Sequence, residues 1–204
     1  AEGVWVRAER QTGGRGRQGR AWESPPGNLY ASTLVRLRPD DPPAPTLALV
    51  AAVALHEAVS LHAAAARIKW PNDITAGGAK LAGILLEREG EAVVVGFGVN
   101  LAHHPSSLER PVTSLDALTG EAPKPQALLE TLACVFMPWL ERWRSEGLAP
   151  IRDRWLKAAH PPGTPLMTPE GAGSFDGLDE SGALRLLLHD GTHRIVHAGD
   201  VFLI

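Results

Sequence analysis

The sequence predicts an α+β protein with a larger N-terminal unit and a small C-terminal unit built only of strands. In the N-terminal part, short valine-rich runs with alternating apolar and polar residues are separated by apolar segments of helical length. The composition changes at Pro161-Pro162, after which short alternating runs are separated by Gly or Asp turns. We therefore expect two domains, residues 1–160 and 161–204.

The first two expected strands flank a loop rich in glycine and arginine. Val4 to Ala8 and Leu29 to Leu37 have the alternation of half-buried strands, and GGRGRQGRAW, Gly13 to Trp22, lies between them. Glycine lets the backbone approach a ligand closely, arginine matches phosphate and carboxylate oxygens, and tryptophan offers a flat face for stacking. The loop predicts an anionic ligand that carries a ring.

Other interpretations of this loop are weaker. A solvated surface loop has a similar composition, and arginine-glycine segments contact nucleic acid without sequence preference. The chain has a formal net charge of −3 and no second basic cluster, which argues against a nucleic-acid partner. The spacing of a Walker A loop, with its lysine, is absent.

A proline-rich linker, Arg38 to Pro45, leads into the most apolar segment of the chain, Thr46 to Ile68. Two histidines and a glutamate interrupt this segment, so it predicts a core helix and not a membrane span. Two further runs follow, Lys80 to Glu87 and Glu91 to Leu101; the second is too β-branched and too rich in glycine for a helix. We expect the two runs to pair as strands.

Two helices and a set of short strands complete the chain. Apolar residues return to a helical period from Gln126 to Gly147, with Pro138 as a kink or break, and Leu148 to Ala159 predicts a further short helix. Cys134 is expected to be packed in the core. The short runs after Pro162 predict a small all-β barrel, a size that is commonly stable only when packed on a neighbour.

Composition limits the classes of protein to which the chain can belong. Its 204 residues, 44% of them hydrophobic, can bury one sizeable core. A single cysteine excludes an internal disulfide and favours a reducing, cytoplasmic location, and the start AEGVWVRAE lacks the features of a signal peptide. We expect no metal held by the chain alone, because neither Cys nor an acid completes a ligand set around His103, His104, His189, His193 and His197.

Four ordered stretches carry a family resemblance. They are GGRGRQGRAWESPPGNLYAS (Gly13 to Ser32), KWPNDI (Lys69 to Ile74), KLAGILLE (Lys80 to Glu87) and VVGFGVNL (Val94 to Leu101). Followed by a small β domain, they resemble the catalytic and C-terminal domains of a biotin protein ligase. The resemblance covers the chain from about Val4, and we expect no N-terminal DNA-binding domain of the kind that repressor-type members carry.

The resemblance implies a mixed-sheet, biotin/lipoate-ligase-like catalytic domain at residues 1–160 and an SH3-like β-barrel at 161–204. Such enzymes use ATP and Mg²⁺ to convert biotin into biotinyl-5′-AMP and pyrophosphate. They then pass biotin to one lysine of the biotin carboxyl carrier protein of acetyl-CoA carboxylase. The implied partners are biotin, ATP and this carrier, with no nucleic acid and no membrane; a homodimer through a strand edge near Glu91 to Leu101 is a further expectation.

The resemblance also implies catalytic roles for three residues. A carboxylate that attacks the α-phosphorus needs fixed cations, because two anions approach each other. Lys80 is implied to bridge the biotin carboxylate and the phosphate, with Arg17 beside it, whereas Asp73 could orient Lys80, hold Mg²⁺ or accept a proton from the carrier lysine. The implied ATP-binding residues are Arg17, Arg20, Trp22, Asn72 and Asn100, with Trp22 against the adenine and Asn100 at its edge.

Biotin is implied to lie along the loop and the strands. Gln11 matches the residue that hydrogen-bonds the ureido group, and glycines in the strands let the backbone approach the bicycle, although simple strand packing would also explain them. We expect the loop to close as a lid that keeps water from the mixed anhydride. The implied biotin-binding residues are Gln11, Gly14, Arg15, Gly16, Arg17, Lys80, Gly83, Gly96 and Gly98.

The sequence departs from the family pattern in two places, and two alternative functions are also compatible with it. A Ser-Thr-Asn-like stretch that helps to hold the ureido ring would precede the first residue, so the chain is truncated, another segment supplies these contacts, or the biotin site is incomplete. Gln18 stands where many relatives carry arginine, which predicts a weaker phosphate contact. The alternative functions are a lipoate ligase, which needs an apolar tunnel, and a non-catalytic biotin-binding relic.

Overall fold

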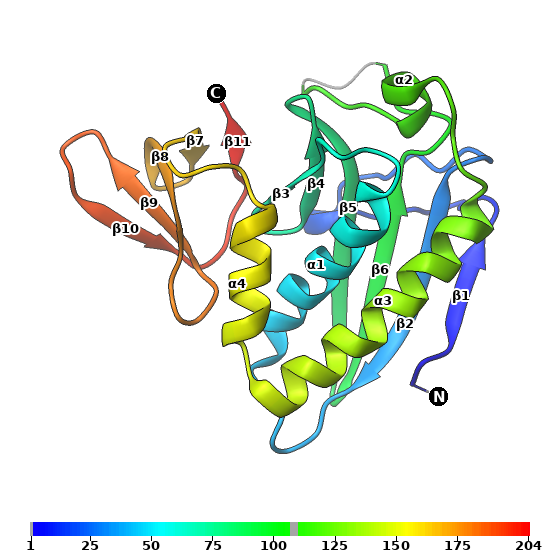
Figure 1. Ribbon diagram of the computed structural model, residues 1–204, viewed down its shortest axis with the longest axis horizontal. Helices are drawn as coiled ribbons and strands as arrows, with labels where there is room; N and C mark the ends of the chain where they lie inside the picture. Colours follow the sequence, from blue (N-terminus) through cyan, green and yellow to red (C-terminus); the bar gives the residue numbers. More distant parts are fainter. Residues whose placement is uncertain (1, 107–109) are drawn as a thin grey trace.

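The computed structural model describes residues 2–106 and 110–204, which form two β-sheets and a layer of helices (Figure 1). The larger sheet has six strands in the order β1-β2-β6-β5-β4-β3. Their bounds are β1 (Trp5–Ala8), β2 (Leu29–Arg36), β3 (Arg67–Lys69), β4 (Asp73–Ala76), β5 (Ala79–Glu89) and β6 (Ala92–Val99). The expected α+β class is confirmed. Every ladder is antiparallel, however, and parallel pairing among the described residues is confined to isolated bridges.

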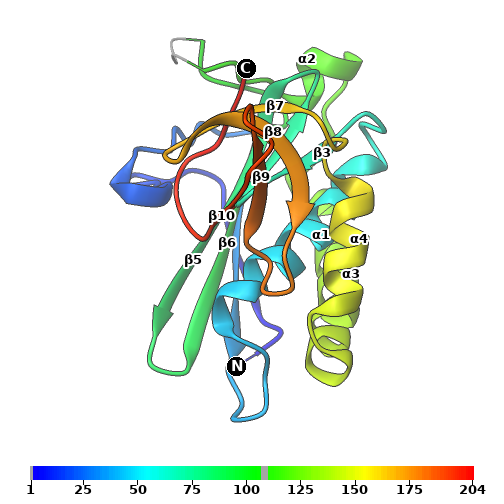
Figure 2. The same ribbon diagram turned by 90° about the vertical axis from the view of Figure 1, so that its left-hand side faces the viewer.

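Helices cover one face of the six-stranded sheet (Figure 2). They are α1 (Leu47–Ser60), α3 (Pro125–Glu146) and α4 (Ala149–Ala158). The strands alternate accordingly: on β6, Val95, Phe97 and Val99 are buried under the helices, while the intervening Val94 is exposed. The opposite face is left for the arginine-rich loop, which Figure 2 shows on the far side of the sheet from α1, α3 and α4.

The core joins the first strand to the helices through aromatic side chains. The ring of Trp5 lies 5.5 Å from Phe97 and 5.6 Å from Phe136 of α3, measured between centroids. Trp143 of α3 is fully buried, and its indole N–H donates to the hydroxyl of Thr46 at 2.8 Å, before α1 begins. These contacts fix the helical layer to the sheet, because buried indole groups need both packing and a hydrogen-bond partner.

The C-terminal strands form a separate antiparallel sheet in the order β10-β9-β8-β7-β11. Their bounds are β7 (Pro165–Thr168), β8 (Gly171–Leu178), β9 (Leu184–Leu188), β10 (His193–Val196) and β11 (Phe202–Leu203). In the described residues β10 and β11 do not pair with each other, so the sheet does not close into the expected barrel. It packs on the first unit through Trp155, whose ring lies 6.2 Å from Phe175, and through a hydrogen bond from Trp70 Nε1 to the carbonyl of Gly182 at 3.2 Å.

Several expectations about single elements are wrong. The helix expected over Thr46 to Ile68 ends at Ser60, and α3 continues through Pro138 without a break. Cys134 is exposed rather than packed in the core. The run Glu91 to Leu101 supplies β6, which pairs on both sides with β2 and β5 and therefore offers no free edge for a homodimer.

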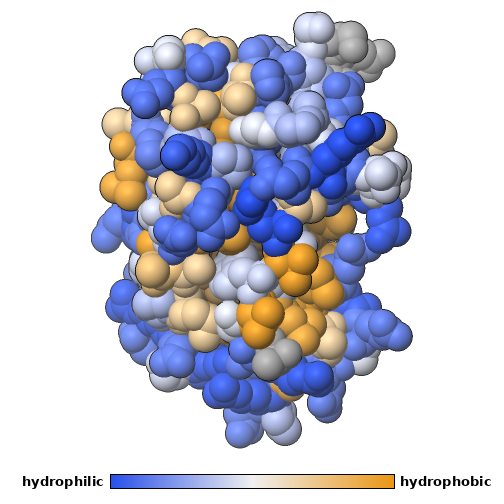
Figure 3. Space-filling view, turned by 90° about the vertical axis from the view of Figure 1, so that its right-hand side faces the viewer, coloured by the Kyte–Doolittle hydropathy of each residue, from blue (hydrophilic) through white to orange (hydrophobic). Residues whose placement is uncertain are grey.

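The free edges of the larger sheet are β1 and β3. The β1 side of the molecule is shown in Figure 3; this surface is mostly hydrophilic, and its main apolar patch lies to the right of and below the centre of the view. Two apolar side chains on or next to β1 are exposed, Val4 at 54% and Val6 at 67%.

A short helix that the sequence did not predict, α2 (Leu115–Thr119), follows β6. No helix among the described residues has the length and hydropathy of a membrane span.

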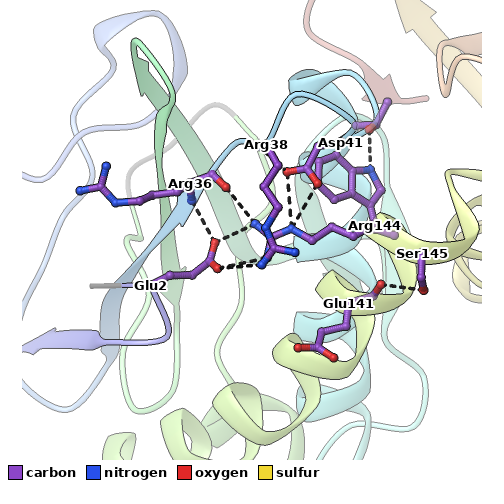
Figure 4. Close-up of polar contacts among 9 residues, drawn as sticks. Glu2, Arg36, Arg38, Asp41, Glu141, Arg144 and Ser145 are labelled. Carbon is purple, nitrogen blue, oxygen red and sulfur yellow. Dashed lines mark hydrogen bonds and ion pairs between the residues drawn. The ribbon is translucent and has the colours of Figure 1, made fainter.

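The N-terminus is tied to the helical layer by an ion-pair network (Figure 4). Arg144 of α3 donates to both carboxylate oxygens of Glu2, at 2.8 and 3.1 Å, and to the carbonyl of Arg36 at 2.9 Å. Its Nε lies 3.3 Å from a carboxylate oxygen of Asp41. The guanidinium therefore joins residues from the start of the chain, the end of β2 and the proline-rich linker to α3.

Candidate active site

A cavity of about 200 Å³ lies on the open face of the larger sheet and reaches the C-terminal sheet. Most of the site residues predicted from the sequence line this cavity. Gly14 and Asn100 do not line the cavity. The predicted residues that do are Gln11, Arg15, Gly16, Arg17, Arg20, Trp22, Asn72, Asp73, Lys80, Gly83, Gly96 and Gly98.

A buried carboxylate between two lysines forms the centre of the cavity. Asp73 begins β4, and its Oδ1 lies 2.5 Å from Nζ of Lys80 on β5, while Oδ2 lies 3.2 Å from Nζ of Lys69 on β3. All three side chains are at most 13% exposed. The antiparallel pairing of β3, β4 and β5 brings these residues together, since Lys69 is opposite Asp73 and Lys80 is opposite Thr75.

The charges at this centre shift the pKa values of Asp73 and Lys80. Burial alone would raise the pKa of Asp73, but the two lysine charges and their hydrogen bonds hold that pKa below its usual value. Burial lowers the pKa of Lys80, and the attraction to Asp73 only partly offsets this effect. Because each oxygen of Asp73 faces a lysine, the geometry favours an orienting role for this carboxylate over a metal-binding one.

The arginine-rich loop is a compact hairpin with its own hydrogen bonds. Gly16 N–H donates to the carbonyl of Arg20 at 2.7 Å, and Trp22 N–H donates to the carbonyl of Gly14 at 2.9 Å. A Cβ at Gly14 would come within 2.4 Å of the Trp22 carbonyl oxygen, so the close approach of the two loop arms requires glycine. Gln18, inside the one-turn 3₁₀ helix η1 (Arg17–Gly19), has a left-handed φ of 57°.

The C-terminal sheet holds this loop over the cavity. Arg17 Nη1 donates to the carbonyl of Gly199 at 3.2 Å and to Oδ1 of Asn72 at 3.4 Å, and Arg20 Nη2 lies 2.8 Å from Oδ1 of Asp200. Lys69 reaches the same segment, donating to the carbonyl of Val201 at 2.6 Å. Gly199, Asp200 and Val201 belong to no motif in the sequence. Their contacts with the loop and with Lys69 depend on how the two sheets pack.

Trp22 lies flat on the floor of the cavity. A Cβ at Gly98 of β6 would meet its ring at 2.7 Å, and one at Gly83 of β5 would meet it at 3.2 Å. The charged Nζ of Lys80 is 5.4 Å from the ring centroid, within the range of a cation–π contact. The indole N–H is buried and has no partner among the described residues. Two of the three strand glycines expected beneath biotin, Gly83 and Gly98, therefore lie beneath this indole, whereas Gly96 does not.

Two other predicted residues take positions set by local hydrogen bonds. Asn100, at the end of β6, is buried and donates through Nδ2 to the carbonyl of Thr113 at 3.0 Å, so it anchors the segment that follows β6. Gln11 lines the cavity, and its Oε1 accepts a hydrogen bond from the Ser24 hydroxyl at 2.8 Å. Arg15, at the rim, lies 3.1 Å from Glu87 of β5.

A residue that the motif analysis missed, Arg110, also lines this cavity. It precedes a segment hydrogen-bonded to Lys80, and lies outside the four stretches that carry the resemblance. Within the described residues, no group of three or more His, Cys, Asp or Glu side chains could hold a metal ion.

Comparisons with known proteins match most of the chain. Residues 2–101 match the biotin/lipoate A/B protein ligase family, and residues 172–204 match the biotin protein ligase C-terminal domain. The chain is 43% identical to the biotin--[acetyl-CoA-carboxylase] ligase of Paracoccus denitrificans, over 98% of this chain and 90% of the relative.

Two solved structures are similar over nearly the whole chain. Biotin protein ligase from Aquifex aeolicus, in complex with biotin and ATP, has a TM-score of 0.89 and 25% identity, covering 100% of this chain and 90% of that one. Biotin protein ligase from Leishmania major, in complex with biotinyl-5-AMP, has a TM-score of 0.67 and 26% identity, covering 95% and 88%.

Proposed function

The chain belongs to the biotin/lipoate A/B protein ligase family, and on this premise we propose how its residues activate and transfer biotin. It is a ligase that uses ATP to convert biotin into biotinyl-5′-AMP and passes biotin on to a protein. The observation that carries the assignment of residues is the buried Lys80–Asp73 pair, which lies beneath an arginine-bearing loop in a cavity floored by strand glycines.

In the first half-reaction, a carboxylate oxygen of biotin attacks the α-phosphorus of ATP. The bond between this phosphorus and the bridging oxygen breaks, and pyrophosphate leaves with the electron pair. We assign Lys80 to the space between the carboxylate and the phosphate, where its charge reduces their repulsion. Asp73 holds the ammonium group in place, and Mg²⁺ bound to the nucleotide contributes further neutralisation of the phosphates.

The remaining residues of the proposal divide between the two substrates. Arg17 and Arg20, with Asn72, are assigned to the phosphates, and Asn100 positions the segment that closes the nucleotide side. Trp22 forms an aromatic wall of the slot, and the loop from Gly14 to Arg17 covers it. The biotin set is Gln11, Gly14, Arg15, Gly16, Arg17, Lys80, Gly83, Gly96 and Gly98.

In the second half-reaction, the amine of an acceptor lysine attacks the acyl carbon of the mixed anhydride. The bond from this carbon to the phosphate oxygen breaks, AMP leaves with the electron pair, and the proton lost by the amine passes to solvent water. We propose the biotin carboxyl carrier protein of acetyl-CoA carboxylase as the acceptor, because the relative from Paracoccus denitrificans carries that substrate in its name. A cytoplasmic location fits this partner and the single cysteine.

The domain division is part of the same proposal. We assign residues 1–160 to adenylation and transfer, and residues 161–204 to a C-terminal unit that holds the loop closed. Hydrogen bonds from Arg17 and Lys69 to the carbonyls of Gly199 and Val201 support this assignment. The Arg20–Asp200 ion pair supports it as well.

The test is biotin-dependent release of pyrophosphate from ATP, with lipoate in place of biotin as a parallel reaction. Lys80→Ala is expected to lower this release by about a hundredfold or more, because a fixed cation at the developing charge is removed. Lys157→Ala, at an exposed position on α4, is the matched control and should keep the wild-type rate.

The competing functions give different outcomes in the same experiment. Release that depends on lipoate and not on biotin would assign the chain to lipoate ligation. Binding of biotin without release from ATP would indicate a binding protein without catalysis. Lys80→Ala with the wild-type rate would refute the role given to Lys80 even if the chain ligates biotin.

A further inference from the structure

The cavity contains more positive charge than its acids neutralise. Its described lining includes three acidic side chains and six cationic ones, which are Asp73, Glu87 and Asp200 against Arg15, Arg17, Arg20, Lys69, Lys80 and Arg110. Each acid already faces a cation, at distances from 2.5 to 3.2 Å. This excess of charge suits a ligand with several negative charges.

Arg110 enters the cavity from a segment that is bonded to the backbone of Lys80. The N–H of Lys80 donates to the carbonyl of Pro111 at 2.9 Å, and the N–H of Thr113 donates to the carbonyl of Lys80 at 2.9 Å. Val112 forms an isolated parallel bridge with Lys80, and Asn100 holds the Thr113 carbonyl. The position of Arg110 is thus set next to that of Lys80.

We propose that Arg110 binds the phosphates of the nucleotide, as a cation held in place independently of the arginine-rich loop. This inference rests on the proposed function and adds a residue to it. A guanidinium can donate two parallel hydrogen bonds to a phosphate, which gives orientation as well as charge. The charge of Arg110 also opposes that of Lys80 and lowers the pKa of Lys80, and a phosphate between them would relieve the repulsion.

The placement of Arg110 distinguishes its role from that of the loop arginines. Arg17 and Arg20 lie on the loop, and their side chains contact Gly199 and Asp200 of the C-terminal unit. Arg110 depends instead on backbone hydrogen bonds to β5. We therefore expect Arg110 to affect the binding of ATP and not the binding of biotin alone.

The experiment measures binding by calorimetry, with a non-hydrolysable ATP analogue and, separately, with biotin. Arg110→Gln should weaken the affinity for the analogue by about tenfold to a hundredfold, the range for a lost charged hydrogen bond. Arg110→Lys should recover part of this affinity, because the charge remains but the planar fork is lost. Affinity for biotin should stay at the wild-type value in both variants.

Arg88→Gln is the matched control, since Arg88 is an exposed arginine on β5 that does not line the cavity. An unchanged affinity for the analogue in Arg110→Gln would overturn the proposal. An equal loss of biotin affinity in that variant would also overturn it, because it would mean a general disturbance of the fold. Binding does not require turnover, so a wild-type protein that binds the analogue without releasing pyrophosphate would contradict the proposed function and leave the Arg110 result valid.

Discussion

Gly98 shows how one missing side chain shapes the candidate site. A Cβ at this position would lie 2.7 Å from Cε2 of the Trp22 indole, closer than packed side chains come to one another. At Gly96, two residues earlier on the same face of β6, the nearest atom would be 3.5 Å away. The resemblance grouped both glycines as biotin-binding, and only the packing against Trp22 separates them.

Gly98→Ala is therefore expected to push the indole off the floor of the cavity and to weaken biotin binding by about tenfold or more, because overpacking typically costs about 1–3 kcal/mol. Gly96→Ala is the comparison variant: a Cβ there would clear Trp22, so the loss of biotin affinity should be smaller than in Gly98→Ala. Calorimetric titration with biotin measures both. Equal effects of the two substitutions would show that contact with Trp22 is not what requires a glycine.

The sequence selected two residues that the structure pairs, Lys80 and Asp73, but it did not select the other partners in the cavity. Lys80 and Asp73 belong to motifs that can be recognised in one dimension, and the structure pairs them at 2.5 Å. The second lysine at Asp73, Lys69, was inside a quoted motif but received no role, because its position depends on the register of β3 on β4. Asp200 could not be found, since nothing in the local sequence marks it as the partner of Arg20.

At the scale of elements, the arginine-rich loop depends on both sheets. Its arms are held by backbone hydrogen bonds within the loop, whereas the guanidinium groups of Arg17 and Arg20 contact the turn between β10 and β11. The expectation of a lid is consistent with this arrangement, because the loop has few buried contacts of its own and no fully buried residue in η1.

Asp200→Asn is expected to loosen the loop and to release or hydrolyse the adenylate faster. The Arg20–Asp200 pair is partly exposed, so the change in folding stability should stay below about 1 kcal/mol, and the rate of adenylate loss should rise by up to about fivefold. The measurement is the hydrolysis of biotinyl-5′-AMP without an acceptor protein.

Asp176→Asn is the matched control for that variant. Asp176 lies in the same C-terminal sheet and pairs with Arg185 at 2.6 Å, outside the cavity. Its substitution should leave adenylate loss unchanged. If Asp176→Asn accelerates the loss as much as Asp200→Asn does, the effect comes from the stability of the sheet and not from the loop contact.

The ends of helices and strands could be predicted where the amino-acid composition changes along the chain. They could not be predicted where an apolar helix is followed by equally apolar residues. The helix that ends at Ser60 was extended to Ile68 because the alanines after it are as apolar as the helix itself, and the turn there has no glycine or proline. Pro138 was expected to kink or break α3; the break does not occur, and the helix continues as one element of 22 residues. Proline removes one backbone donor, and burial of the apolar face of α3 outweighs that cost.

At the scale of the whole molecule, the cavity belongs to neither sheet alone. Its floor comes from β5 and β6, its cover from the loop, and one wall from the segment before β11. The change of composition at Pro161 and Pro162 allowed two units to be predicted, but the sequence could not show that the second unit completes the site of the first. This depends on long-range packing between Trp155 and Phe175 and between Trp70 and Gly182.

The N-terminus contributes to the same assembly through Glu2. Arg144, with a side chain only 8% exposed, connects Glu2 to Asp41 and to the backbone at Arg36. The hydrogen bond from Arg144 is the main reason that the pKa of Glu2 lies below its ordinary value of 4.5. A carboxyl group with a lowered pKa in the folded state binds its proton more weakly there than in the unfolded state.

The stability contributed by Glu2 should therefore be present above about pH 4.5 and disappear as the pH falls through the lower pKa of the folded protein. Glu2→Gln is expected to lower the free energy of unfolding at pH 7 by about 1 kcal/mol, which is less than the usual contribution of a charged hydrogen bond because the side chain is 24% exposed. Urea unfolding at a series of pH values measures the difference in the free energy of unfolding between wild type and Glu2→Gln. This difference should shrink towards zero in acid.

Glu89→Gln, at an exposed position of β5, is the control and should show no such dependence. A difference that stays constant from neutral to acid pH would mean that Glu2 acts through packing and not through its charge.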